Sequence, residues 1–191
     1  MKILLIDPFY NNGVVPPNYS LGEIEKYIVD TNVEIEVIDF VHKNKMNMKR
    51  REDLLRDILF LIEKSQRKGS RRLNADKNIL YWEIGRLIKQ DLYSKETTLH
   101  RIDTFKYLSR ELVERYGKEF EVRHLLQMEL FCVYFPELEI VSDLSKKLTW
   151  THFLKLFLID NKLHRDDYAK ACKEEGWSSS VLHGKIMKLI I

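Results

Sequence analysis

The side chains whose types and spacing suit them for chemistry are basic, and they fall in two places. The first is a run over residues 64–72, where spacings of three and four residues bring most of the cations near one face of a helix. The members of this basic run are Lys64, Arg67, Lys68, Arg71 and Arg72. Such a face can bind the phosphates of DNA. A solvated helix surface is the alternative, and the sequence leaves both interpretations open.

The second group lies at the start of a helix that we predict over residues 122–135. Residues 108–116, a turn at Gly117 and this helix have the spacing of a helix-turn-helix, whose second helix enters the major groove with its first turns. The side chains there that can hydrogen-bond to base edges are Arg123, His124 and Gln127. The acidic residues that flank them are Glu119, Glu121 and Glu129. Because carboxylates repel phosphate, a plain hairpin of two helices is the alternative.

Constellations for catalysis or for metal binding are missing from the sequence. The six histidines form no pair at metal-ligand spacing, and no G-x-S-x-G motif is present. A PD-(D/E)XK nuclease core needs an Asp and a D/E-x-K on neighbouring strands, and no strand pattern follows residue 42. We therefore predict no catalytic residue, no metal site and no cofactor, and we expect that the protein is not an enzyme.

Charge divides the chain into three unlike parts, although the net charge of the 191 residues is only +3. Residues 1–42 carry a net charge of −5, residues 43–72 carry +7 and residues 73–191 carry +1. The middle part is the one that suits a polyanion. We predict a βαβ appendage over residues 1–42, a basic helix or connector over 43–72 and a helical domain over 73–191.

The appendage is predicted from three local patterns. A continuous apolar run at Ile3–Ile6 is typical of a buried strand, Ser20 and Glu23 form a capping box for a helix, and Val33–Ile38 alternates as a second strand does. Together they make one βαβ unit. Such a unit buries too little surface to be stable alone.

The appendage also resembles the start of the cobalamin-binding domain that precedes radical-SAM enzymes. The resemblance lies in Lys2–Tyr10, Pro16-Pro17 and Leu21–Ile28. The D-x-H-x-x-G and C-x-x-x-C-x-x-C motifs of those proteins are both absent. We therefore predict neither cobalamin binding nor radical chemistry.

From Lys49 onward the apolar residues repeat at helical period. The expected helices cover residues 54–62 and beyond, 72–92, 104–116 with Thr104 as the cap and Gly117 as the end, 122–135, 144–157, 166–175 ended by Gly176, and 178–190. The predicted fold class is therefore mainly α, with a candidate helix-turn-helix, preceded by the short βαβ appendage.

Cys132 and Cys172 lie in apolar helical patterns without metal-ligand spacing, which predicts buried reduced thiols. His152 lies beside an apolar face, as a hydrogen-bonded core histidine does. No apolar run reaches the roughly 18 residues of a membrane span. The N-terminus becomes charged too soon for a signal peptide. These features predict a cytoplasmic protein without a membrane partner.

Short motifs spread in order over about 140 residues of the chain carry a second resemblance. They are Leu80–Arg86, Leu108-Ser109 with Leu112, Phe120 with Arg123, Leu125, Met128, Phe131 and Phe135-Pro136, Leu148–His152, Arg165 with Tyr168, and Glu174–Ser178 with Leu182 and Ile186. These motifs resemble the N-terminal domain of the YhcG-type nucleases, a bacterial family catalogued as a domain of unknown function, DUF1016. The resemblance implies a helical DNA-binding module that precedes a PD-(D/E)XK nuclease domain.

The chain ends at Ile191, where the nuclease domain of that family would begin. The resemblance therefore predicts the binding half without the catalytic half: a non-catalytic module with DNA as its partner. The alternative is a protein-interaction or oligomerisation module that pairs with a nuclease domain or with a second copy, without binding DNA. The aromatic motif residues Tyr81-Trp82, Trp150 and Trp177 lie within apolar series, which favours core packing over base stacking.

Overall fold

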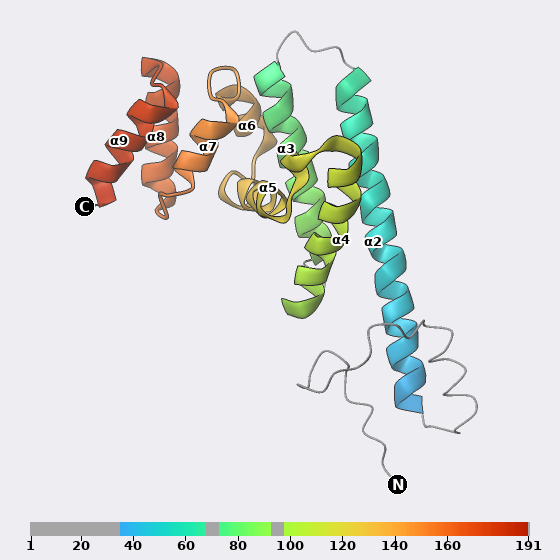
Figure 1. Ribbon diagram of the computed structural model, residues 1–191. Coiled ribbons are helices and arrows are strands. Elements are labelled where there is room, and N and C mark those ends of the chain that lie inside the picture. Colours follow the sequence, from blue (N-terminus) through green and yellow to red (C-terminus); the bar gives the residue numbers. More distant parts are fainter. Residues whose placement is uncertain (1–34, 68–72, 93–97, 191) are drawn as a thin grey trace. The chain divides into compact units, whose positions relative to one another are not determined.

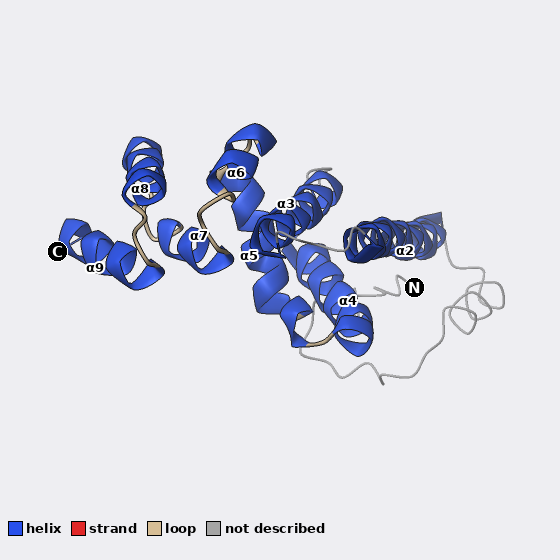
Figure 2. Cartoon of the chain, turned by 90° about the horizontal axis from the view of Figure 1, so that it is seen from above, coloured by secondary structure: helices blue, strands red, loops and turns tan. Residues whose placement is uncertain are grey.

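The computed structural model describes residues 35–67, 73–92 and 98–190, and every regular element in these ranges is a helix (Figure 1 and Figure 2). In chain order the elements are α2 (Ile35–Arg67), α3 (Leu73–Leu92), α4 (Thr98–Tyr116), the 3-10 helix η1 (Lys118–Phe120), α5 (Val122–Tyr134), α6 (Leu138–Leu144), α7 (Trp150–Leu156), α8 (Lys162–Glu175) and α9 (Ser179–Ile190). The prediction of a mainly helical protein is confirmed.

The predicted second strand of the appendage is wrong over residues 35–38, because these residues form the first turn of α2. Val33–Ile38 alternates at period two, but Val37, Phe40 and Val41 also follow one another at helical spacing. A strand needs a partner for its backbone groups, whereas a helix already present beyond residue 45 extends by one hydrogen bond per added residue. The first strand, the capped helix and the cobalamin resemblance lie outside the described residues.

The chain divides into two compact units, Met1–Glu52 and Asp53–Ile191, and the division falls inside α2. In the first unit the described residues are the first half of α2, which carries the exposed Met46 and Met48. The second unit contains the rest of α2 and all the later helices. Our predicted bounds at residues 42 and 72 remain predictions.

The centre of the second unit is the contact between α3 and α5 (Figure 1). Gly85 of α3 lies directly against the backbone of α5: a Cβ added to Gly85 would lie 1.8 Å from the carbonyl oxygen of Met128. Only a residue without a side chain lets two helix backbones approach this closely. Leu125 and Phe131, on either side of Met128 in α5, are fully buried in the same core.

Aromatic rings fill the space between α5 and α7. Phe131 packs against Trp150, Phe153 and Phe157, with ring centroids 4.6–6.0 Å apart. On the α3 side, the indole N–H of Trp82 donates a hydrogen bond of 2.7 Å to the carbonyl oxygen of Phe135. The motif aromatics are therefore structural. Tyr81 and Trp82 are buried, and Trp150 and Trp177 pack against the core as predicted.

Glycine ends two helices where the sequence predicts it. Gly117 follows α4 with a φ of 93°, and Gly176 follows α8 with a φ of 68°, a region of backbone conformation that favours glycine. The predicted start of α4 at Thr104 is wrong. The helix begins at Thr98, and Thr104 is completely buried inside it. A threonine that packs in a helix interior and one that caps a helix look alike in sequence.

The helix predicted over residues 144–157 starts too early. α7 begins at Trp150, with Thr149 as its N-cap, and it is preceded by the short helix α6, which was not predicted and ends at Leu144. The Nδ1 of His152 accepts hydrogen bonds from the backbone N–H and the hydroxyl of Thr149, at 3.1 and 2.8 Å. Its Nε2–H donates to the carbonyl oxygen of Trp177 at 3.0 Å. His152 is thus the hydrogen-bonded core histidine that the sequence predicts.

Both cysteines are free and buried, also as predicted. Burial raises the pKa of the Cys132 thiol to about 11, and it raises the pKa of Cys172 as well. No helix in the described ranges is long and apolar enough to cross a lipid bilayer.

Candidate nucleic-acid interface

The basic run is described only in part, because Lys68, Arg71 and Arg72 lie outside the described residues. Lys64 and Arg67 belong to the last turn of α2, and both are exposed. The guanidinium of Arg67 lies 3.4 Å from the carboxylate of Glu63, an ion pair at the surface with both partners in water. Exposed pairs of this kind contribute at most about 1 kcal/mol, so phosphate could displace the carboxylate.

The hairpin of α4 and α5 is built around a tight turn. Gly117 donates its backbone N–H to the carbonyl of Val113 at 2.9 Å and so closes α4. Phe120 of η1 is buried and packs edge-on against Tyr116, at 5.9 Å between ring centroids. α5 then begins at Val122 without a side-chain cap from Glu121. The backbone N–H groups of its first turn therefore lack a side-chain partner, and such groups attract anions.

The three predicted base-reading side chains differ in what they offer. Arg123 is exposed. His124 is half-buried, and its Nδ1–H donates to the carbonyl oxygen of Lys118 at 3.0 Å. In the neutral imidazole, this bond leaves Nε2 as a hydrogen-bond acceptor. Gln127 is also half-buried, and its amide oxygen is enclosed without a hydrogen-bond partner among the described residues.

Glu119, one of the three flanking acids, is tied to α3. Lys77 donates to its carboxylate at 2.8 Å and the hydroxyl of Tyr81 donates to the same oxygen at 3.0 Å. The ammonium group of Lys77 also lies 5.3 Å from the centre of the Tyr81 ring. Glu119 is therefore neutralised and anchors the turn to α3.

Glu129, the second acid, is buried in α5 and held by Arg101 of α4. Arg101 makes two hydrogen bonds to the carboxylate, one of 2.7 Å to Oε1 and a shorter one to Oε2. A paired guanidinium is the usual way in which a protein tolerates a buried carboxylate. Glu121, the third acid, is exposed and is the one that still opposes a nearby phosphate.

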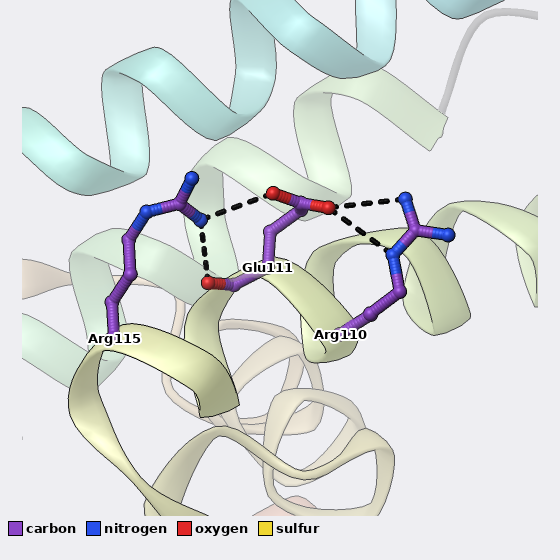
Figure 3. A network of polar contacts seen from close by, with 3 residues as sticks. All are labelled: Arg110, Glu111 and Arg115. Atoms are coloured by element: carbon purple, nitrogen blue, oxygen red, sulfur yellow. Dashed lines mark hydrogen bonds and ion pairs between the residues drawn. The ribbon is translucent and has the colours of Figure 1, made fainter.

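The cations of α4 near the turn are also partly neutralised. Arg110 and Arg115 converge on Glu111 from either side (Figure 3). Arg110 donates twice to the carboxylate, at 3.0 and 3.1 Å, and Arg115 donates to the carboxylate at 3.1 Å and to the backbone carbonyl at 2.6 Å. Arg110 first, and then Arg115, lower the pKa of Glu111. The cluster keeps a net charge of +1, and the Arg110 side chain is 71% exposed.

Beyond its first two turns, the outer face of α5 is apolar. Leu130 is 39% exposed and Val133 is 48% exposed. Two adjoining hollows of about 330 and 320 Å³ lie along this face and share Lys89 of α3 in their walls. In the described part of the chain, no three acidic, histidine or cysteine side chains come together as a metal site would require.

Arg67 pairs with Glu63 within α2, and His124 of α5 bonds to Lys118 of the turn, so these contacts do not bring the two predicted groups together. The partners of the acids, Lys77, Tyr81 and Arg101, were not predicted. Arg101 lies 28 residues before Glu129, beyond the reach of local spacing rules. One signal was available: Glu129 falls on the buried stripe of its helix, next to Met128 and Cys132, where a carboxylate requires a cationic partner.

Residues 57–190, more than two thirds of the chain, match the sequence model of the DUF1016 N-terminal domain. The chain belongs to this family. The resemblance that the sequence predicts is thereby confirmed, and the matched region starts inside α2 and ends with α9.

A relative is found in Escherichia coli (strain K12), where it bears the name "Putative nuclease YhcG". The two sequences are 30% identical over 93 residues, which are 48% of this chain and 25% of the relative. The matched segment thus spans about a quarter of the relative's length. No solved structure matches the chain.

Proposed function

We propose that this chain is a non-catalytic module that binds duplex DNA through the turn between α4 and α5. The observation that carries the proposal is the state of the flanking acids. Lys77 and Tyr81 bind Glu119, and Arg101 binds Glu129. Two of the three carboxylates that would repel phosphate are therefore neutralised.

The charge that remains at the turn is modestly positive. Lys118 and Arg123 are exposed cations, and Glu121 is the exposed acid between them. The first turn of α5 adds backbone N–H groups and the positive end of the helix dipole. These features support about two phosphate contacts, which correspond to a slope of about −2 in a plot of log affinity against log salt concentration. The proposed complex is weak and sensitive to salt.

The proposal is tested by fluorescence anisotropy with a labelled duplex of about 20 base pairs, at salt concentrations from about 50 to 200 mM. Arg123→Ala removes the exposed cation of α5, and Lys170→Ala removes an exposed cation of α8 as the matched control. We expect Arg123→Ala to weaken binding about tenfold and Lys170→Ala to leave it unchanged. Glu121→Gln should strengthen binding.

Two results would overturn the proposal. The first is the absence of detectable binding at about 50 mM salt, where even non-specific DNA binders associate. The second is equal binding by the Arg123→Ala and Lys170→Ala variants, which would place the contact elsewhere. The expectation that the chain does not cleave DNA is tested separately, by incubating plasmid with the purified protein and Mg²⁺. The predicted cytoplasmic location belongs with this proposal, since both cysteines are free.

The name of the relative suggests the context in which such a module acts. We propose that the domain delivers a nuclease to DNA, either within one chain or as a separate partner. The second candidate function, docking to a protein, is favoured by the exposed Leu130 and Val133 on α5. The two functions use opposite ends of α5 and are compatible.

A further inference from the structure

We propose that the groove along α3 and α5 is a docking site for an acidic, amphipathic segment of a partner protein. The docking groove is the surface formed by Arg86, Lys89, Arg101, Leu130, Val133 and Pro136. It lies beyond the first turns of α5, and the inference does not depend on DNA binding.

The groove consists of two shallow hollows. One hollow, of about 330 Å³, is lined by Leu92, Arg101 and the outer face of α5. The other, of about 320 Å³, is lined by Trp82, Arg86 and Pro136. Because Lys89 lines both hollows, they adjoin along α3. Each is large enough for an apolar side chain of a partner.

The charge of the groove selects the partner. Its walls carry three cations, Arg86, Lys89 and Arg101. Among the described lining residues the carboxylate is that of Glu129, and it already accepts two hydrogen bonds from Arg101. Arg86 keeps its positive charge, because the hydrogen bond that it makes is to the neutral amide of Gln90. The walls are therefore cationic around a partly apolar floor. A segment that places carboxylates beside its apolar side chains complements this pattern.

Leu130 and Val133 decide against nucleic acid as the occupant. They line the first of the two hollows and are 39% and 48% exposed. A phosphate backbone gains nothing from apolar surface, whereas an amphipathic helix buries it. The groove sits on the same helix as the proposed DNA contact but faces a different class of partner.

The same charges disfavour a second copy of the chain. A symmetric dimer places identical surfaces against each other. Arg86 of one copy would then approach Arg86 of the other. Repulsion between like charges opposes that arrangement. A partner of opposite charge does not meet this obstacle.

The length of the groove sets the size of the segment. Along α3 the lining residues run from Trp82 to Leu92. At 1.5 Å per residue these ten steps span about 15 Å, the length of about ten residues of a partner helix. Such a helix makes nearly three turns. It presents apolar side chains at spacings of three, four and seven residues.

The test uses two labelled peptides of about 14 residues, each with leucines on one helical face. The first carries glutamates on the other face, and the second has glutamine at every one of those positions. Binding to the full chain is measured by fluorescence anisotropy. Val133→Glu places a carboxylate in the groove. Val181→Glu, on α9, is the matched control, because Val181 is also 48% exposed. Urea unfolding of both variants checks that they fold.

We expect the glutamate peptide to bind saturably and the glutamine peptide to bind at least tenfold more weakly. Val133→Glu should weaken binding at least tenfold, while Val181→Glu leaves it unchanged. Arg86→Glu should also weaken it, with Lys170→Glu of α8 as the charge-matched control. Binding of duplex DNA should be the same in the wild type and in Val133→Glu. The docking proposal can therefore fail while the DNA-binding proposal holds, and the DNA-binding proposal can fail while the docking proposal holds.

Four results would overturn the proposal. One is the absence of saturable binding of the glutamate peptide up to about 1 mM. Another is that the wild type binds the glutamate and glutamine peptides equally well, or that the Val133→Glu and Val181→Glu variants bind the glutamate peptide equally well. The third is that the wild type dimerises and Val133→Glu makes it monomeric, which would identify a second copy as the occupant. The fourth is weaker DNA binding by Val133→Glu, which would identify nucleic acid.

Discussion

Replacing Gly85 by alanine should destabilise the protein, although alanine is the better helix former. In a helix, glycine is about 1 kcal/mol less favourable than alanine, so helix propensity alone predicts a gain in stability. At Gly85, however, the added methyl group would lie 1.8 Å from the carbonyl oxygen of Met128 and 2.4 Å from its carbonyl carbon. The steric conflict and the gain in propensity therefore have opposite signs.

The geometry sets the size of the effect. Ordinary van der Waals contact begins at about 3.4 Å, so α3 and α5 would have to separate by about 1.6 Å at this point. The clashing atoms belong to the backbone of α5 and cannot rotate away. Overpacking of a core costs about 1–3 kcal/mol, and a backbone clash lies at the upper end of that range. After subtracting the gain in propensity, we expect a net loss of about 2 kcal/mol or more for Gly85→Ala.

Gly184→Ala is the matched control. Gly184 lies inside α9, and a Cβ added there would have no neighbour within 4 Å. This substitution should stabilise the protein by about 0.5–1 kcal/mol. In urea unfolding, with a slope of about 2 kcal/mol per molar, the midpoint of Gly85→Ala should fall by about 1 M and that of Gly184→Ala should rise slightly. If both variants are as stable as the wild type or more so, the close crossing of α3 and α5 is refuted.

Three further predictions concern buried polar groups. Arg101→Met should lower the free energy of unfolding by about 2–3 kcal/mol, because it leaves the carboxylate of Glu129 buried without a cation. A double variant that also carries Glu129→Met should recover much of this loss in thermal melts. A double variant as unstable as Arg101→Met alone would contradict this explanation. Burial raises the pKa of Tyr81 to about 12, above the value of 10.0 in an unfolded chain. This shift contributes about 2–3 kcal/mol to the free energy of unfolding below pH 10, and the contribution is lost as pH rises towards 12. Tyr81→Phe should flatten the stability curve in that window, and an unchanged curve would exclude this titration as its cause. Finally, the Cys132 thiol, with its pKa raised to about 11, should react with a thiol-specific disulfide reagent at pH 8 only after unfolding; fast reaction of the native protein would show that it is not buried.

The fold could be predicted from sequence wherever a short stretch of chain determines the result. The ends of α4 and α8 lie at Gly117 and Gly176 because a backbone with positive φ favours glycine at those positions. The buried thiols and the core aromatics follow from apolar residues at helical spacing. The helix start at Thr104 was predicted wrongly, because only the packing around Thr104 distinguishes an interior threonine from a cap.

The candidate site depended on contacts between distant residues, and there the sequence was less informative. Glu119 and Glu129 argued against DNA binding as long as they counted as free charges. Their partners lie on other helices, 28 to 42 positions away in sequence, and no spacing rule connects them. What the sequence could not supply was the charge that remains after these pairs form. That remaining charge is the quantity on which binding to a polyanion depends.

The burial of α5 separates the two proposed functions. α5 packs against α3, α4 and the turn between α4 and α5, and Leu125, Met128 and Phe131 are fully buried. A helix held in this way exposes only its first turn and one outer stripe. Arg123 lies in the first turn and Val133 lies in the outer stripe. Because the first is cationic and the second apolar, substitution of one should leave the function of the other intact. A variant at either position that abolished both DNA and peptide binding would show that α5 presents a single surface.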